Sequence, residues 1–333
     1  MKSFKFIDLF AGIGGFHQAA AANGGVCLFA SEIDSAAKIA YEANYGLQPH
    51  GDITKVDIEL IPDHDLLCAG FPCQPFSIIG NRQGFDDIRG TLFFEIVKIL
   101  ESKKPPMIVL ENVKQLATHD NKRTITKIID TLKSLGYKTD WKVLNALDYG
   151  LPQKRERVLI VGFLNHDVVF NWPEKIKHYK PLSEILEHNI DNKHLASQRI
   201  ADKRQAKHTS EHYPSIWHEN KSGHISSYPF SCALRSGASY NYLLVNGERR
   251  LTPREMLRLQ GFSDNFKIVC TDSQTRKQAG NAVPVPMIEA VIKEVLNAAT
   301  ETTRCQAQKK YRAIPVRGLS ESCNLRGQPV AYI

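Results

Sequence analysis

One cysteine stands between two prolines, directly after a short apolar run. The run covers residues 65–69, and the chain continues as Gly70-Phe71-Pro72-Cys73-Gln74-Pro75-Phe76-Ser77. Because proline fixes φ and has no N–H to donate, the two prolines hold Cys73 at the tip of a stiff turn and outside strand pairing. A thiol held in this way suits covalent catalysis. The competing interpretation, which a lone cysteine favours, is a small, half-buried packing residue.

A carboxylate and two arginines also border apolar runs. Residues 107–110 predict a buried strand that delivers Glu111 and Asn112 to its carboxyl end. Burial there would raise the pKa of Glu111 and suit it to acid–base chemistry, whereas a capping or salt-bridged carboxylate is the alternative. Arg155 and Arg157 stand two apart at the start of another strand. They therefore point the same way and suit phosphate or carbonyl recognition, unless they form a solvated charge run.

A glycine-rich turn lies between the first predicted strand, residues 5–10, and the first predicted helix, residues 16–23. Its G-x-G-G spacing differs from the G-x-G-x-x-G of pyrophosphate binders and favours a nucleoside ligand without phosphates, such as S-adenosylmethionine. Glu32 ends the second predicted strand about 20 residues later, where dinucleotide folds place the acid that accepts ribose hydroxyls. Asp52 and Ile53 are expected at the end of a further strand.

Strands that alternate with helices must bring these residues together. This alternation predicts a parallel sheet with right-handed crossovers, which binds ligands at the carboxyl ends of its strands. A capping box, Thr252-Pro253-Arg254-Glu255, predicts the start of a helix that Gly261 ends. Further helices are expected at residues 91–102, 124–135 and 285–298, and a disordered tail beyond residue 300.

Composition narrows the class of protein. The chain has 333 residues, an ordinary apolar fraction of 42%, a net charge of +8 and seven cysteines without paired spacing. No run reaches the length of a membrane helix, no signal peptide is recognisable, and the cysteines favour a reducing, cytoplasmic compartment. The basic charge suits a polyanionic partner, although about half of the excess falls after residue 300. Four histidines between 208 and 224 favour a polar contact surface over a metal site.

Six blocks of this sequence, in this order, resemble the DNA (cytosine-5)-methyltransferase family, and more narrowly the compact bacterial modification methylases of restriction–modification systems. The resemblance spans Phe6 to about Ala298. The blocks are Phe10-Ala11-Gly12-x-Gly14-Gly15, the Cys73 stretch, Glu111-Asn112-Val113, Gln153-x-Arg155-x-Arg157, Arg250-Leu251-Thr252-Pro253-Arg254-Glu255 and Gly280-Asn281.

The resemblance implies a covalent mechanism on a cytosine flipped out of double-stranded DNA. It implies that Cys73 adds to carbon 6, that Glu111 hydrogen-bonds N3, and that Arg157 contacts O2 with Arg155 beside it. Carbon 5 then takes the methyl group of S-adenosylmethionine. The segment from Ser77 to Arg89 is expected to close as a lid. The expected DNA contacts are Ser77, Arg89 and Arg235, with a solvated side chain as the alternative for Arg235.

The resemblance also implies a cofactor pocket. Its expected residues are Phe10, Ala11, Gly12, Gly14, Glu32, Ile33, Asp52, Ile53, Pro72 and Asn281. Relatives often carry an aromatic residue at the position of Ile33, so weaker stacking on the adenine is expected. Relatives also commonly show Thr-Leu where this chain has Ala233-Leu234, which removes a hydroxyl usable for the DNA backbone.

The expected architecture is an α/β protein with a Rossmann-like methyltransferase sheet and a small, mostly β or irregular target-recognition domain. Residues 1–180 and 271–300 would form the catalytic domain, 181–270 the recognition domain, and 301–333 a disordered basic tail. We expect a monomer without metal, membrane or obligate protein partner. Three alternatives stay open: a transfer-RNA methylase of the same family, a nicotinamide oxidoreductase, and a catalytically silent DNA-binding protein. The recognised bases cannot be read from loop composition.

Overall fold

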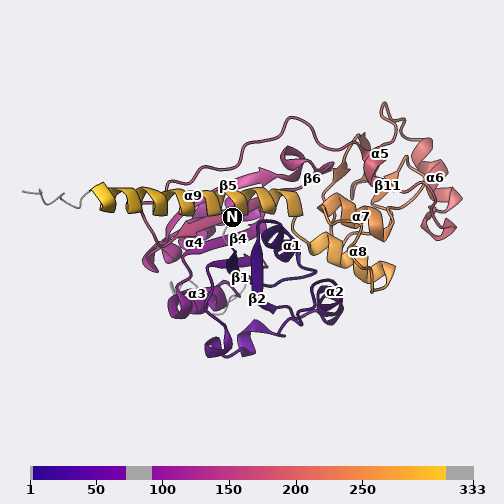
Figure 1. Cartoon of the computed structure of the whole chain (residues 1–333). Helices are drawn as coiled ribbons and strands as arrows, with labels where there is room; N and C mark the ends of the chain where they lie inside the picture. The colour runs from indigo at the N-terminus through magenta and orange to yellow at the C-terminus, as the bar shows by residue number, and fades with distance from the viewer. Residues whose placement is uncertain (1–2, 73–91, 313–333) are drawn as a thin grey trace, which may run out of the picture.

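A six-stranded sheet forms the centre of the molecule (Figure 1). The computed structural model describes residues 3–72 and 92–312, so Cys73, Ser77 and Arg89 lie outside the described residues. The strands follow the order β2 (Gly25–Ser31), β1 (Phe4–Leu9), β3 (Leu66–Gly70), β4 (Met107–Val113), β7 (Glu156–Phe163) and β5 (Lys138–Asn145). The strands β2, β1, β3 and β4 pair in parallel, as alternating strands and helices predict.

The prediction of a wholly parallel sheet was wrong for β7, which is antiparallel to both β4 and β5. The connection from β5 to β7 explains this, because it holds only the turn η6 (Ala146–Tyr149) and the two-residue strand β6 (Gln153–Lys154). A parallel crossover needs about a dozen residues or more. The reversed strand has a useful result: Arg157, near its start, pairs with Val113, at the end of β4.

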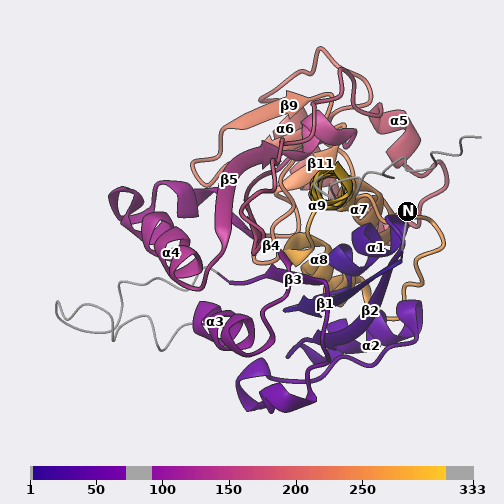
Figure 2. The same ribbon diagram turned by 60° about the vertical axis from the view of Figure 1, so that its left-hand side comes forward.

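Helices cover both faces of the sheet, as Figures 1 and 2 show together. Helices α1 (Gly15–Ala22) and α9 (Val285–Arg312) share one core with Phe6 and Val109. Helices α3 (Leu92–Lys103) and α4 (Arg123–Ser134) share the other core with Ile7 and Ile108. The alternation of neighbouring strand residues between two cores follows from the two-residue period of a strand. Helix α2 (Ser35–Tyr45) lies beside β2.

Helix α9 is longer than its pattern predicts. It continues to Arg312, so the prediction of disorder from residue 301 was wrong for 301–312. No glycine or proline interrupts the helix after Pro286. The hydroxyls of Thr300, Thr302 and Thr303 donate to carbonyls one turn earlier, which places these polar side chains along the helix without breaking it.

Asp52 and Ile53 do not end a strand, contrary to the prediction. Asp52 is instead the N-cap of a single 3₁₀ turn, η1 (Ile53–Lys55), and its carboxylate accepts a hydrogen bond from the Thr54 N–H at 3.0 Å. The segment still reaches the end of β2, because His50 bridges to Ser31 there. Further 3₁₀ turns in the described part of the chain are η2 (Ile58–Leu60), η4 (Lys114–Ala117), η5 (His119–Lys122) and η7 (Asn192–His194).

The chain between β7 and α9 forms a second, mixed region (Figure 1). It contains a three-stranded antiparallel sheet in the order β11-β8-β9, while β10 pairs with β6, which precedes β7 in the chain. The capping box at Thr252 is confirmed at the start of α7. The elements are α5 (Leu182–Ile185), α6 (Gln198–Gln205), β8 (Ile216–Glu219), β9 (Ile225–Tyr228), β10 (Ser231–Cys232), β11 (Leu243–Val245), α7 (Pro253–Gln260) and α8 (Asp272–Asn281). Within the described part of the chain, no helix combines the length and apolarity needed to span a membrane.

Candidate active site

A cavity of about 1180 Å³ opens where the parallel strands end. The catalytic side contributes the ends of β1 to β4 and the start of β7, and the second region contributes residues 234–239. Most of the predicted site residues line this one cavity, although they come from distant parts of the chain. They are Phe10, Ala11, Gly12, Glu32, Ile33, Asp52, Ile53, Pro72, Glu111, Arg155, Arg157, Arg235 and Asn281.

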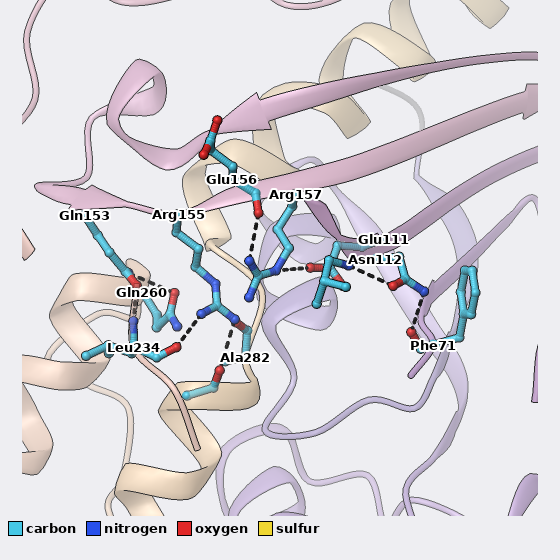
Figure 3. A network of polar contacts seen from close by, with 12 residues as sticks. Phe71, Glu111, Asn112, Gln153, Arg155, Glu156, Arg157, Leu234, Gln260 and Ala282 are labelled. Carbon is cyan, nitrogen blue, oxygen red and sulfur yellow. Dashed lines mark hydrogen bonds and ion pairs between the residues drawn. The ribbon is translucent and has the colours of Figure 1, made fainter. Parts of the chain in front are cut away.

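Glu111 and Arg157 form an ion pair at the floor of the cavity (Figure 3). The Arg157 Nε lies 2.8 Å from the Glu111 Oε1, and both side chains are largely buried. Burial raises the pKa of the Glu111 carboxyl, as expected from its position, while the guanidinium groups of Arg157 and Arg155 oppose that rise. The Arg157 Nη1 also donates a hydrogen bond to the Glu156 carbonyl at 2.8 Å, so these two contacts fix the orientation of the guanidinium.

Asn112 does not reach the cavity. Its Nδ2 donates to the Phe71 carbonyl at 2.9 Å, and its Oδ1 accepts from the Val113 N–H at 2.8 Å (Figure 3). These contacts fasten the end of β3 to the end of β4, one residue before Pro72. Asn112 therefore fixes the place from which the chain departs toward Cys73.

Arg155 makes contacts that sequence reasoning did not anticipate. Its guanidinium donates to the carbonyls of Leu234 at 2.8 Å, Gly280 at 3.1 Å and Ala282 at 2.9 Å (Figure 3). Burial, and then the neighbouring Arg157 guanidinium, lower the pKa of Arg155. The Arg155 side chain thus lines the cavity, and its guanidinium binds the main chain of two separate segments, one at Leu234 and one at Gly280 and Ala282.

The glycine turn is held from behind by an aromatic side chain. Gly14 has φ +82°, and a Cβ at this position would lie 2.1 Å from the Tyr45 ring. The Tyr45 hydroxyl donates to the Gly14 carbonyl at 3.0 Å. Gly14 therefore shapes the turn from the side opposite the cavity. Gly12, with φ +55°, has open space where a Cβ would be, and this leaves room for a ligand close to the backbone.

Glu32 and Ile33 provide a polar and an apolar group side by side. The two Glu32 carboxylate oxygens accept hydrogen bonds from the Gly12 N–H at 2.7 Å and the Asp34 N–H at 2.8 Å. The Ile33 side chain is 74% exposed at the cavity wall. An exposed aliphatic surface beside an anchored carboxylate fits a nucleoside, with the ring against the isoleucine and the ribose near the acid.

On the opposite wall, Arg235 is exposed and its guanidinium lies over the Tyr242 ring, 4.9 Å from the ring centre. Sequence reasoning missed one ion pair at this cavity: the Lys277 Nζ lies 2.7 Å from the Asp34 carboxylate. Lys277 belongs to α8, a helix with so weak an apolar pattern that periodicity does not reveal it. Among the described residues, no three His, Cys, Asp or Glu side chains are arranged to hold a metal.

Comparisons with known proteins agree with this geometry. The model of the C-5 cytosine-specific DNA methylase family matches residues 4–297. The Type II methyltransferase M.NgoBI of Neisseria gonorrhoeae is 54% identical over 297 residues, which cover 87% of this chain and 92% of that protein. M.HaeII of Haemophilus aegyptius is 53% identical, with 94% and 98% covered.

A solved structure of the S. pombe Dnmt2 methyltransferase has the same fold, with a TM-score of 0.68 and 22% sequence identity over 88% of this chain and 98% of that one. The family match covers both walls of the cavity. The chain therefore belongs to the C-5 cytosine-specific DNA methylases, which transfer the methyl group of S-adenosylmethionine to carbon 5 of cytosine.

Proposed function

We propose that Cys73, Glu111 and Arg157 carry out the reaction on a flipped-out cytosine. The Cys73 thiolate forms a bond to carbon 6 while the carboxyl of Glu111 donates a proton to N3. Carbon 5, made nucleophilic by this addition, takes the methyl group that S-adenosylmethionine supplies. Loss of the carbon-5 proton to a base then expels the Cys73 thiolate, and the N3 proton returns to the Glu111 carboxylate, which restores the neutral ring and the free enzyme.

The ion pair between Glu111 and Arg157 is the observation that carries this assignment. A buried carboxyl with a raised pKa is suited to donate a proton, and the guanidinium beside it keeps the carboxyl oriented. Arg157 also lines the same cavity, and its remaining donors suit the O2 of cytosine. Pro72 lines that cavity immediately before Cys73, which supports a nucleophile near this pair.

The cofactor would occupy the part of the cavity between the glycine turn and Asn281. The room beside Gly12 and the exposed Ile33 support close approach of a nucleoside. We assign the ribose to Glu32, the adenine to Phe10, Ile33, Asp52 and Ile53, and the remaining contacts to Ala11, Pro72 and Asn281. Gly14 contributes through the shape of the turn.

The substrate would be a short, specific sequence in double-stranded DNA, with Ser77, Arg89 and Arg235 as contacts. The exposed Arg235 on the wall opposite Glu111 supports this arrangement. Both relatives described above are named Type II methyltransferases, which supports a role in protecting DNA from a cognate restriction endonuclease. We propose that the chain acts as a monomer.

A direct test maps 5-methylcytosine by conversion sequencing in DNA from a host that expresses the chain. We expect one short motif to be methylated throughout, and Cys73→Ser to abolish that methylation while DNA and cofactor binding persist. The matched control is Cys68→Ala, because Cys68 is fully buried in β3 and serves packing. This control should lower stability but keep the methylated motif.

Two outcomes would overturn the proposal. Normal methylation by Cys73→Ser would falsify the role of the thiol. Unmodified DNA from well-expressed wild-type protein, together with methylated transfer RNA in a parallel assay with labelled cofactor, would move the substrate from DNA to RNA.

A further inference from the structure

Arg155 is an unusual buried cation. Its side chain is only 1% exposed, yet among the described residues no carboxylate lies within ion-pair distance of its guanidinium. A buried guanidinium needs compensating partners, because removal of its charge from water is costly. Arg155 finds them in the three main-chain carbonyls of Leu234, Gly280 and Ala282 (Figure 3).

These carbonyls belong to two segments that are far apart in the sequence and that both line the cavity. Leu234 directly precedes the exposed Arg235 on the recognition side. Gly280 and Ala282 flank Asn281 at the end of α8, on the cofactor side. The last carbonyls of a helix have no partner within the helix, so a cation there satisfies them and is favoured by the helix dipole. The side chain of Arg155 thus connects residues 234–239, here called the recognition loop, to the end of α8.

These two segments also touch each other directly. A Cβ built on Gly280 would lie 2.4 Å from the Ser236 nitrogen and 2.8 Å from the Arg235 carbonyl carbon. Gln153, two residues before Arg155, connects the recognition loop to α7. Its Oε1 accepts from the Leu234 N–H at 2.9 Å, and its Nε2 donates to the Leu259 carbonyl at 2.8 Å. A displacement of the recognition loop must therefore disturb the turn around Asn281.

We propose that Arg155 is a positioning residue that couples DNA binding to cofactor binding, through its simultaneous hold on the recognition loop and on the turn around Asn281. The proposal rests on the roles assigned above to Arg235 and Asn281. Coupling of this kind is reciprocal. DNA that orders the recognition loop also orders the turn that binds the cofactor, and bound cofactor in turn raises the affinity for DNA.

The test uses binding alone, with the full-length chain and S-adenosylhomocysteine as the probe. Titration calorimetry gives its Kd without DNA and with a saturating duplex that carries the mapped motif. We expect the duplex to tighten binding about tenfold in the wild type, within the usual range for coupled sites. In Arg155→Lys, the gain should fall below about twofold, because an ammonium is a point charge that cannot span carbonyls of two segments.

Arg204→Lys is the matched control. Arg204 is as deeply buried as Arg155, but its partners Trp217, Glu219 and Asn241 all lie within the recognition region. This variant should lose stability and keep the tenfold gain. Cys73→Ser should also keep the gain, so a failure of the catalytic assignment is distinguishable from a failure of the coupling.

Two results would overturn the inference: a wild type whose affinity for S-adenosylhomocysteine does not change with DNA, or an Arg155→Lys variant that retains the full gain. If Arg155→Lys does not fold, as judged by circular dichroism, Gly280→Ala replaces it. The added methyl group must push Ser236, and with it the Leu234 carbonyl, away from Gly280, which breaks the simultaneous hold of Arg155 on both segments. Loss of the gain supports the proposal, and a tenfold gain in Gly280→Ala contradicts it.

Discussion

At the scale of single residues, the site depends on how Glu111 is kept ready to donate a proton. Burial disfavours the charged carboxylate, and the Arg157 guanidinium 2.8 Å away favours it. The net result is that the pKa of Glu111 is raised toward neutral pH, while the ion pair with Arg157 keeps the carboxyl oriented. A lone buried glutamate would have a still higher pKa and would be protonated more often, but it would have no fixed direction toward the base.

Glu111→Gln tests this balance. The amide keeps the shape of the side chain but cannot transfer a proton, so we expect the single-turnover methylation rate to fall about 10²- to 10⁴-fold. DNA affinity should change only slightly, because the cavity wall is preserved. The measurement is transfer of a tritiated methyl group to the mapped duplex.

Glu156→Gln is the control for this substitution. Glu156 is adjacent to Arg157, but its carboxylate pairs with Lys114 at 2.9 Å and does not line the cavity. We expect its rate to stay within about twofold of the wild type. A Glu111→Gln variant that keeps a tenth or more of the wild-type rate would exclude Glu111 as the proton donor.

At the scale of elements, α1 and α2 hold the glycine turn through a buried polar cluster. The His17 ring stacks on Tyr45 at 4.0 Å, and its Nδ1 lies 2.7 Å from the Tyr41 hydroxyl. Burial lowers the pKa of His17 to about 4 and raises the pKa of Tyr41. Burial also raises the pKa of Asp8.

This cluster makes stability depend on pH. His17 has a lower pKa in the folded than in the unfolded chain, so the unfolded chain binds more protons between pH 6.5 and about 4. The stability contributed by neutral His17 is complete above pH 6.5 and is lost as the pH falls through that window. Between pH 7 and 4.5 we expect the wild type to lose about 2 kcal/mol more than His17→Phe, which keeps the stack on Tyr45.

Urea denaturation at the two pH values measures this difference. Asp8 is present in both proteins, so its own titration cancels in the comparison. His50→Phe, at an exposed position beside Phe29, controls for the loss of an imidazole and should follow the wild type. Parallel stability curves for the wild type and His17→Phe would contradict the assignment of the pH dependence to His17.

At the scale of the whole molecule, the sequence predicted the features that depend on local patterns but not those that depend on long-range contacts. The apolar runs before Glu111 and Gly70 predicted β4 and β3, because a buried strand needs only its own residues to be recognised. The antiparallel direction of β7 depends on a short connection. The three carbonyl partners of Arg155 lie 79, 125 and 127 residues away from it in the sequence. No local pattern encodes such contacts, so the role of Arg155 became visible only in the fold.

The packing of α9 against the sheet and α1 can be tested through the stability of the whole molecule. Ile292 is fully buried in the core that α9 shares with α1. Ile292→Ala should lower the free energy of unfolding by about 2–5 kcal/mol, because it removes apolar contacts and leaves a cavity. Urea denaturation provides the measurement, and the exposed Lys293→Ala on the same helix should stay within about 0.5 kcal/mol of the wild type. Equal losses in both variants would show that α9 does not close this core.

The packing of α9 on α1 also has a consequence for biosynthesis. Asn23, directly after α1, donates to the Glu289 carbonyl of α9, a separation of 266 residues. A ribosome that adds about 5–20 residues per second makes α9 roughly 15–50 s after α1. During that interval the nascent chain carries Phe16 and Ala19 on a surface that lacks its covering helix. The apolar surface of α1 therefore stays uncovered until α9 leaves the ribosome.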